Sequence, residues 1–301
     1  MKIFSDALYY NIKKIFIMPV VIKRWKFQRY KIIKMLRTRK VVSFVGDGRC
    51  DSPGHYVKYC TYTLMELESG YVIDSVVISV TEVKNSNCME KEGFIRVLET
   101  LKKAGVKIDF IATDCHTQIQ KTLKLDLRFN NINHQYNPWH VAKSISKKMH
   151  KTSKNSSKKD LLEWIPPVVN HFWWSVGTSN KNPHLMYEKF SSILYHIQNV
   201  HKWGGCSYFH KCEHEPYSKQ NEDSRNWLDA KSDTSQFLVY LVKSKSLKEI
   251  FENLTEAIQT TNVEVFNNLL LKFIPKQYHF KYDHMVMGAY LAALDHNFNA
   301  E

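Results

Sequence analysis

Residues 41–48 read Val-Val-Ser-Phe-Val-Gly-Asp-Gly, an apolar run that ends in an acidic side chain, Asp47. Two further runs, Tyr59–Glu66 and Tyr71–Val80, are rich in aromatic and β-branched residues, and a turn at Ser69-Gly70 separates them. Runs of this kind, bounded by turn residues, are typical of β-strands. We therefore predict three antiparallel strands, the first over Val41–Gly46, with residues 47–54 forming the loop that follows it.

The pattern changes downstream of these strands to an alternation of helices and strands. Apolar residues at helical spacing predict a helix over Glu90–Ala104, and Ile108–Ala112 has the character of a buried strand. A helix over residues 115–124, a short strand over Asn131–Tyr136 and a helix over Trp139–Met149 complete the series. Three antiparallel strands followed by parallel ones predict an α/β fold with a mixed sheet.

Strand signals fade after Lys151, and a mostly helical region is expected there, with residues 204–234 as a loop. Helix returns at Val263–Phe273, which follows the capping residues Thr261 and Asn262. The predicted organisation is a basic N-terminal segment (1–40), the first part of a core (41–150), a helical insertion (151–257) and the remainder of the core (258–301).

The formal net charge of the 301 residues is +14, and it is concentrated in two segments. Residues 1–40 carry twelve basic residues against one acid, and residues 141–160 carry seven against one. Basic patches of this kind favour a polyanionic partner, either nucleic acid or an anionic membrane face. The first segment is expected to be either a basic amphipathic helix interrupted at Pro19 or a disordered tail.

Two sequence features bear on the compartment. The longest apolar run, Ile15–Ile22, is too short to cross a bilayer, so we expect no membrane-spanning segment. The six cysteines are scattered, which predicts reduced thiols in an intracellular protein.

Two aspartates follow strands that are expected to be neighbours. Asp47 ends the first predicted strand and Asp114 ends the fourth. Parallel neighbours bring their carboxyl ends to one edge of a sheet, where paired carboxylates are ligands for two divalent metals that act on a phosphodiester. A helix from elsewhere would supply a third acid, and Glu264 lies at the start of one. An ordinary turn or capping role for each aspartate is the simpler alternative.

The segments Phe44–Leu64 and 111–114 (Ile-Ala-Thr-Asp) resemble the acid-bearing strands of a ribonuclease-H-like fold. The strings at Gly46–Tyr62, Thr81–Phe94, Ile111–Ile119, Asn131–Lys143 and Leu269–Lys276 resemble transposon-derived proteins of the Mutator, hAT and Kolobok kind. These are DDE-type, cut-and-paste transposases. The resemblance implies a ribonuclease-H-like core interrupted by a mostly helical insertion.

The family pattern also implies catalytic positions. The first acid corresponds to Asp47, with Asp51 as the nearby alternative, and the second corresponds to Asp114. The third corresponds to Glu264, with Asp295 as the runner-up. The three chosen acids would bind two Mg²⁺ or Mn²⁺ ions.

Two further elements of the family pattern fall between the second and third acids. An accessory Cys or Asp, two residues and a His correspond here to Asn137 and His140, so Asn137 departs from the pattern. The resemblance also implies phosphate contacts from a lysine tract made up of Lys143, Lys147, Lys148, Lys151, Lys154, Lys158 and Lys159.

The function that this resemblance implies is metal-dependent cleavage and transfer of DNA strands. The partners would be DNA and a second copy of the chain, and the location would be the nucleus. The alternative is a domesticated, catalytically inactive remnant that binds nucleic acid or a protein.

A compact group of soft ligands, Cys206, His210, Cys212 and His214, suggests a separate structural zinc site. A zinc-stabilised nucleic-acid-binding module without catalysis is therefore a second alternative.

Overall fold

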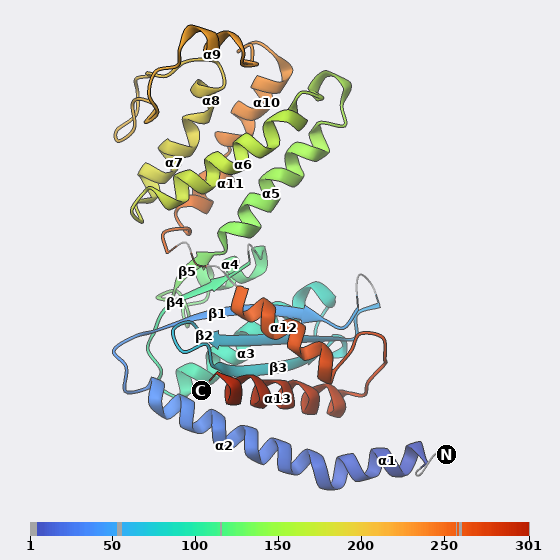
Figure 1. Ribbon diagram of the computed structural model, residues 1–301. Coiled ribbons are helices and arrows are strands. Elements are labelled where there is room, and N and C mark those ends of the chain that lie inside the picture. Colours follow the sequence, from blue (N-terminus) through green and yellow to red (C-terminus); the bar gives the residue numbers. More distant parts are fainter. Residues whose placement is uncertain (1–4, 53–55, 115, 257, 259–260, 301) are drawn as a thin grey trace. The chain divides into compact units, whose positions relative to one another are not determined.

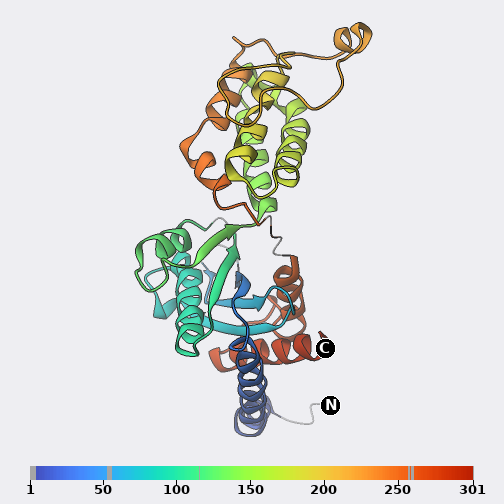
Figure 2. The same cartoon turned by 90° about the vertical axis from the view of Figure 1, so that its left-hand side faces the viewer.

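The computed structural model describes residues 5–52, 56–114, 116–256, 258 and 261–300. The chain divides into two compact units, which are drawn from two directions in Figures 1 and 2. Unit 1 comprises residues 1–134 and 260–301, and unit 2 comprises residues 135–259. The N-terminal basic segment thus belongs to unit 1, and unit 2 begins at Gln135.

A five-stranded sheet forms the centre of unit 1, and the last two residues of its fifth strand are the first residues of unit 2. Its strands are β1 (Val42–Cys50), β2 (Tyr59–Glu66), β3 (Val72–Ser79), β4 (Ile108–Thr113) and β5 (Asn133–Tyr136). The strand order is β3-β2-β1-β4-β5. Strand β1 runs antiparallel to β2 and parallel to β4, and β2 runs antiparallel to β3. The predicted α/β class with a mixed sheet is therefore confirmed.

Strand β1 is longer than predicted, and the loop expected from Asp47 starts later. Its ladder with β2 continues through Asp47↔Thr63 to Cys50↔Cys60. A partner strand is available along this whole stretch, so its backbone groups stay paired despite the turn-like residues. The chain leaves the ladder at Asp51, whose Oδ1 accepts a hydrogen bond from the Lys58 N–H at 3.1 Å.

Helices cover both faces of this sheet (Figure 2). Helix α3 (Met89–Lys103) and helix α4 (Thr117–Leu125) share one hydrophobic cluster with the sheet. Helix α12 (Thr261–Phe273) and helix α13 (Tyr282–Asn299) share the other. Helix α3 lies so close to the sheet that a Cβ at Gly93 would overlap the side chain of Tyr62.

The basic N-terminal segment is helical and part of the unit 1 core. It consists of α1 (Asp6–Ile12), a π-helical turn (Lys13–Ile17) and α2 (Met18–Leu36). Pro19 lies in the first turn of α2, directly after the π-helical turn, and the right-handed helical backbone of Ile17 and Met18 continues past the turn into α2. Trp25 is 1% exposed and stacks on Tyr290 of α13 at a centroid distance of 5.6 Å.

Side chains from α2 and α13 satisfy backbone groups of β3, which is the last strand of the sheet on its side. The Asn297 amide accepts from the Val72 N–H at 2.8 Å and donates to the Val72 carbonyl at 2.9 Å. Arg29 donates to the carbonyl of Ile73 at 3.1 Å and pairs with Asp74 at 2.6 Å. The hydroxyl of Tyr282 donates to the Val77 carbonyl at 3.2 Å.

Unit 2 is mostly helical in its described residues. Its helices are α5 (Pro138–Thr152), α6 (Leu161–Gly177), α7 (Pro183–Ser191), α8 (Ile193–His196), α9 (Lys219–Asp223), α10 (Asp233–Val242) and α11 (Lys245–Phe251). The rings of Phe172, Phe190 and Phe251 lie within 5.4–5.9 Å of one another and are buried at its centre. Among the described helices of the chain, none is both long enough and apolar enough to span a membrane.

Candidate functional site

The strand register sets Asp47 beside Asp114. In the parallel pair, Val45 of β1 lies opposite Ala112 of β4. Asp47 comes two residues after Val45 within β1, and Asp114 comes two residues after Ala112, directly past the end of β4. The negative charges of both aspartates act on Glu90 and on Tyr62, so the two side chains belong to one region. Asp47 and Asp114 are half-buried.

Helix α12 is tied to this position. Asn267 is buried, and its side-chain amide donates to Oδ2 of Asp47 at 2.7 Å. Glu264 lies in the first turn of the same helix, three residues earlier, and is half-buried. Residues three apart are neighbours on a helix surface, so the hydrogen bond brings the Glu264 turn towards β1. The helix starts at Thr261, two residues earlier than predicted, and residue 260 of the expected capping turn lies outside the described residues.

A further acid, which the sequence analysis did not select, belongs to the same region. Glu90 lies in the first turn of α3, and burial raises its pKa to about 8, with the negative charges of Asp47 and Asp114 adding to the rise. Gly48 makes room for it, because a Cβ there would overlap the Glu90 side chain. In the sequence, an acid in the first turn of a helix is ordinary, since it complements the helix dipole. The sequence therefore gave no signal for Glu90.

Unpaired polar atoms gather around these acids. Among the described residues, four buried side-chain polar atoms have no hydrogen-bond partner. Three of them are the Tyr62 hydroxyl, His116 Nδ1 and Asn267 Oδ1. Tyr62 lies against Gly46, and His116 Nε2 is 3.7 Å from Glu90 Oε2. Buried polar groups without partners are costly, so this region is suited to a hydrated ion.

Hydrogen bonds from the neighbouring Thr113 hold the backbone at Asp114. The hydroxyl of Thr113 donates to the Asp114 carbonyl at 2.8 Å and contacts Nε2 of buried His134 at 2.8 Å. Because the hydroxyl proton is already used, Nε2 of His134 is the donor in this contact. Burial lowers the pKa of His134 to about 4, with the nearby charge of Lys124 acting in the same direction, so the ring is neutral at pH 7.

The two runner-up acids have other roles. Asp51 closes the β1–β2 connection through the Lys58 N–H. Asp295 accepts from the side-chain amide of Asn299 at 3.3 Å near the end of α13. Its neighbour His296 contacts the carbonyl of Gly70 at 2.9 Å, beside the β2–β3 turn. The β2–β3 turn follows Glu66, which pairs with Phe44 near the start of β1. Asp47 lies further along β1, opposite Thr63.

The accessory position and the lysine tract belong to unit 2. Asn137 caps α5, since its side chain accepts from the Trp139 N–H at 2.9 Å. Asn and Asp are equally good N-caps, so this substitution preserves the local structure. His140 is half-buried on α5, and its ring meets the Trp139 ring edge to face at 4.7 Å.

Helix α5 displays its lysines to solvent. Lys143, Lys147 and Lys151 recur every fourth residue, which places them on one side of the helix, and all three are exposed. We call these three residues the α5 lysine stripe. Nζ of Lys143 lies 4.2 Å from the centroid of the Trp139 ring, which is 44% exposed. Of the remaining tract residues, Lys148, Lys154 and Lys159 are exposed and Lys158 is half-buried.

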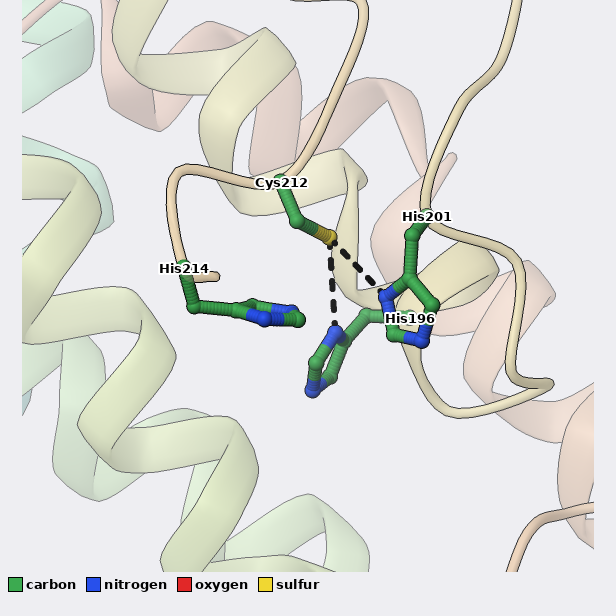
Figure 3. Close-up of side chains that lie close together, drawn as sticks. All are labelled: His196, His201, Cys212 and His214. Atoms are coloured by element: carbon green, nitrogen blue, oxygen red, sulfur yellow. Dashed lines mark hydrogen bonds between the residues drawn. The ribbon is translucent and has the colours of Figure 1, made fainter. Parts of the chain in front are cut away.

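A second group of ligand residues lies within unit 2. His196, His201, Cys212 and His214 each offer one ligand atom, and these atoms all lie within 4.8 Å of one another. Figure 3 shows the four side chains converging from three stretches of chain. The sulfur of Cys212 is 3.4 Å from Nδ1 of His196 and 3.4 Å from Nδ1 of His201. This group could hold a metal ion.

The group differs from the predicted zinc site in two members. Cys212 and His214 belong to it, whereas Cys206 and His210 do not. The reason is an antiparallel bridge between Lys202 and Lys211, which sets His201 opposite Cys212 through a hydrogen bond from the Cys212 N–H to the His201 carbonyl at 3.0 Å. The preceding helix α8 adds His196 as its last residue.

Comparison of the sequence with known proteins does not assign the chain to a family. A scan against protein-family models finds no match, and a search of the curated proteins also finds none.

Proposed function

We propose that the chain is a metal-dependent DNA phosphoryl transferase of the ribonuclease-H-like, transposase-like kind. The observation that carries this proposal is the register of β1 and β4, which pairs Val45 with Ala112, two residues before Asp47 and Asp114. The strand order, with three antiparallel strands before a parallel fourth, supports the same interpretation. So does the helix bearing Glu264, which is joined to Asp47 through Asn267.

The donor set is suited to Mg²⁺ or Mn²⁺. Both ions prefer carboxylate oxygens and retain waters, and this region combines four acids with unpaired polar atoms that can contact such waters. In the proposal, Asp47, Asp114 and Glu264 hold two ions, and Glu90 adds a fourth acid, which a bound cation would favour in its carboxylate form. The ions would supply Lewis acidity that activates a water or 3′-hydroxyl and stabilises the leaving 3′-oxygen.

The residues around the acids hold them in place. Asn267 fixes the orientation of the Asp47 carboxylate, and the Thr113–His134 pair fixes the backbone at Asp114. His116 is half-buried, and burial lowers its pKa against the opposing effect of the Asp114 charge, which favours the neutral imidazole. A neutral imidazole there can exchange a proton with a reacting oxygen without adding charge.

DNA is the proposed substrate, and the α5 lysine stripe is the proposed phosphate contact. Exposed lysines at regular spacing beside an exposed tryptophan suit a nucleic-acid backbone with an adjacent base. Action on two DNA ends would need two copies of the chain, and action on genomic DNA would place the protein in the nucleus. The DNA substrate, the second copy of the chain and the nuclear location all follow from the proposed chemistry.

The test is nicking of supercoiled plasmid by the purified full-length chain with Mn²⁺. Substitutions Asp47→Asn and Asp114→Asn should each lower the nicking rate by about 100-fold or more. Asp51→Asn and Asp295→Asn remove one charge each elsewhere in unit 1, and the nicking rate should stay at the wild-type level.

The results separate the proposal from its alternatives. Nicking that survives Asp114→Asn would refute this assignment of the site. Salt-sensitive DNA binding without nicking in any metal would favour the catalytically inactive remnant.

A further inference from the structure

A long stretch of unit 2 has little regular structure and buries little apolar surface. Between residues 198 and 232 the described regular structure is the five-residue helix α9 and the single bridge between Lys202 and Lys211. Among the residues of this stretch whose burial is described, Phe209 is the only buried hydrophobic side chain. Loops of this length usually need a staple, because they bury too little apolar surface to offset their conformational entropy.

The His/Cys group lies where such a staple would act. His201, Cys212 and His214 belong to this stretch, and His196 anchors them to helix α8. In a tetrahedral zinc site, with Zn–S of about 2.3 Å and Zn–N of about 2.0–2.1 Å, sulfur and nitrogen ligands lie about 3.5 Å apart. The two distances of 3.4 Å from Cys212 Sγ to the imidazole nitrogens agree with this geometry.

Hydrogen bonds at the remote nitrogens direct the imidazoles towards the centre of the group. Nε2 of His201 contacts Oδ1 of Asn199 at 2.9 Å and is the donor, since a carbonyl oxygen only accepts. The lone pair of Nδ1 therefore faces Cys212. Nδ1 of His214 likewise donates to the Glu215 carbonyl at 2.7 Å, which leaves Nε2 as its ligand atom. Metal-bound histidines almost always have such a partner on the second nitrogen.

The residue that orients His201, Asn199, is itself held in place. Asn199 has a positive φ of 60° and donates from its side chain to Oε1 of Glu222 at 2.6 Å. The chain Glu222–Asn199–His201 thus fixes the ring of His201 from α9. Tyr217 stacks on His214 at a centroid distance of 4.4 Å and restricts that ring.

We propose that His196 Nδ1, His201 Nδ1, Cys212 Sγ and His214 Nε2 bind one Zn²⁺ ion that staples residues 198–217 to helix α8. Three nitrogens and one thiolate are a ligand set that zinc accepts in tetrahedral sites. Four protein ligands leave no position open for a substrate, so the site is structural. The proposal is independent of the acids of unit 1.

The experiment is metal analysis of the full-length chain, purified without a metal-binding tag. Inductively coupled plasma mass spectrometry should find about one zinc per chain. Replacing that zinc with Co²⁺ should give the strong visible bands of a tetrahedral cobalt–thiolate site. His214→Asn, at the most exposed ligand, should lower the zinc content at least about fivefold, and Cys212→Ser should abolish the thiolate-to-cobalt band.

The chain offers matched controls. Cys206→Ser and His210→Ala alter the same residue types in the same loop but lie outside the group, and zinc content should not change. Loss of zinc in these controls would overturn the ligand assignment in favour of the sequence-predicted set. Wild-type protein that neither contains zinc nor takes up Co²⁺ would overturn the proposal altogether. Where a ligand variant fails to fold, wild-type metal content and the control variants still decide the outcome.

Discussion

The side-chain amide of Asn267 donates a hydrogen bond of 2.7 Å to Oδ2 of Asp47 and so joins helix α12 to strand β1. The two residues lie 220 positions apart in the sequence, and the residues of unit 2 come between them along the chain. The same amide carries a buried oxygen, Oδ1, without a hydrogen-bond partner.

Asn267→Asp should destabilise unit 1. The substitution removes the donor and places a carboxylate within hydrogen-bond distance of Asp47, which should cost about 1–3 kcal/mol of unfolding free energy at pH 7. Urea unfolding in EDTA measures this cost. Mn²⁺ should reduce it, because a divalent ion offsets the added charge. Asn268→Asp, at the exposed neighbouring position, makes the same change without the contact. A cost as large at Asn268 would contradict the explanation.

His134 should make the stability of unit 1 fall in mild acid. Its folded pKa of about 4 lies below the unfolded value of about 6.5, so the unfolded chain takes up a proton first as the pH drops. Stability should decrease by about 2 kcal/mol between pH 7 and pH 5. Hydrogen exchange of β1 amides measures the change, and His134→Gln should remove it. The exposed His150→Gln variant should keep the wild-type slope. An unchanged slope in His134→Gln would assign the effect to other groups.

Gly93→Ala should destabilise the packing of α3 on the sheet. A Cβ at this position overlaps the Tyr62 side chain, which is fully buried, so the helix has to shift. Overpacking of this kind costs about 1–3 kcal/mol, measurable by chemical denaturation. Gly177→Ala is the control, because a Cβ there meets nothing within 4 Å. Equal stability of the two variants would show that α3 adjusts freely.

Asn199→Gly should weaken zinc binding about 10- to 100-fold, since it removes the acceptor that orients His201. Glycine is chosen because it keeps the positive φ of 60° accessible. Competition with a chromophoric chelator gives the affinity. Asn226→Gly, an exposed position in the same stretch, should leave the affinity unchanged. Equal affinities of Asn199→Gly and wild type would remove Asn199 from the proposed support.

Substitution of the α5 lysine stripe should weaken DNA binding and flatten its salt dependence. If Lys143, Lys147 and Lys151 each contact one phosphate, changing all three to Ala reduces the magnitude of the slope of log affinity against log salt by about 2.7, at about 0.9 per contact. Fluorescence anisotropy with a labelled duplex measures both quantities. A triple Ala variant at exposed Lys231, Lys243 and Lys245 makes the same charge change elsewhere in unit 2. An equal effect of both variants would indicate unspecific charge attraction.

Local patterns predicted most of the sheet and the helices between its strands. Strands β2 and β3 are buried on both faces, and their runs of aromatic and β-branched residues bounded by turn residues mark them in the sequence. Helix α3 buries one side, which leaves a helical period in its apolar residues. Helix α13 has no one-sided apolar pattern in the sequence, because it packs on the sheet and on α2 and is surrounded by apolar residues such as Met285, Met287 and Ala292. The sequence of α2 fits both a helix and a disordered tail, because its buried residues are few among many lysines and arginines.

Some residues of the candidate sites can be predicted from local sequence patterns, and others cannot. Asp47 and Asp114 could be assigned to one sheet edge from the sequence, because each ends an apolar run in a strand order that implies neighbours, although β1 continues past Asp47 to Cys50. Glu90 and Asn267 could not, because they reach that edge only through the packing of α3 and α12 on opposite faces. Only Cys212 and His214 of the candidate metal ligands are close in the sequence, whereas His196 comes from a preceding helix and His201 from the opposite side of a bridge.

The coverage of β3 by Arg29, Asn297 and Tyr282 has a practical consequence for fragment expression. An edge strand with unpaired backbone groups invites another chain to add to the sheet and promotes aggregation. A fragment beginning at Val41, where the strand pattern starts, would lose Arg29 and expose the ring of Tyr290 that Trp25 covers. The N-terminal boundary of a soluble fragment therefore lies before α2.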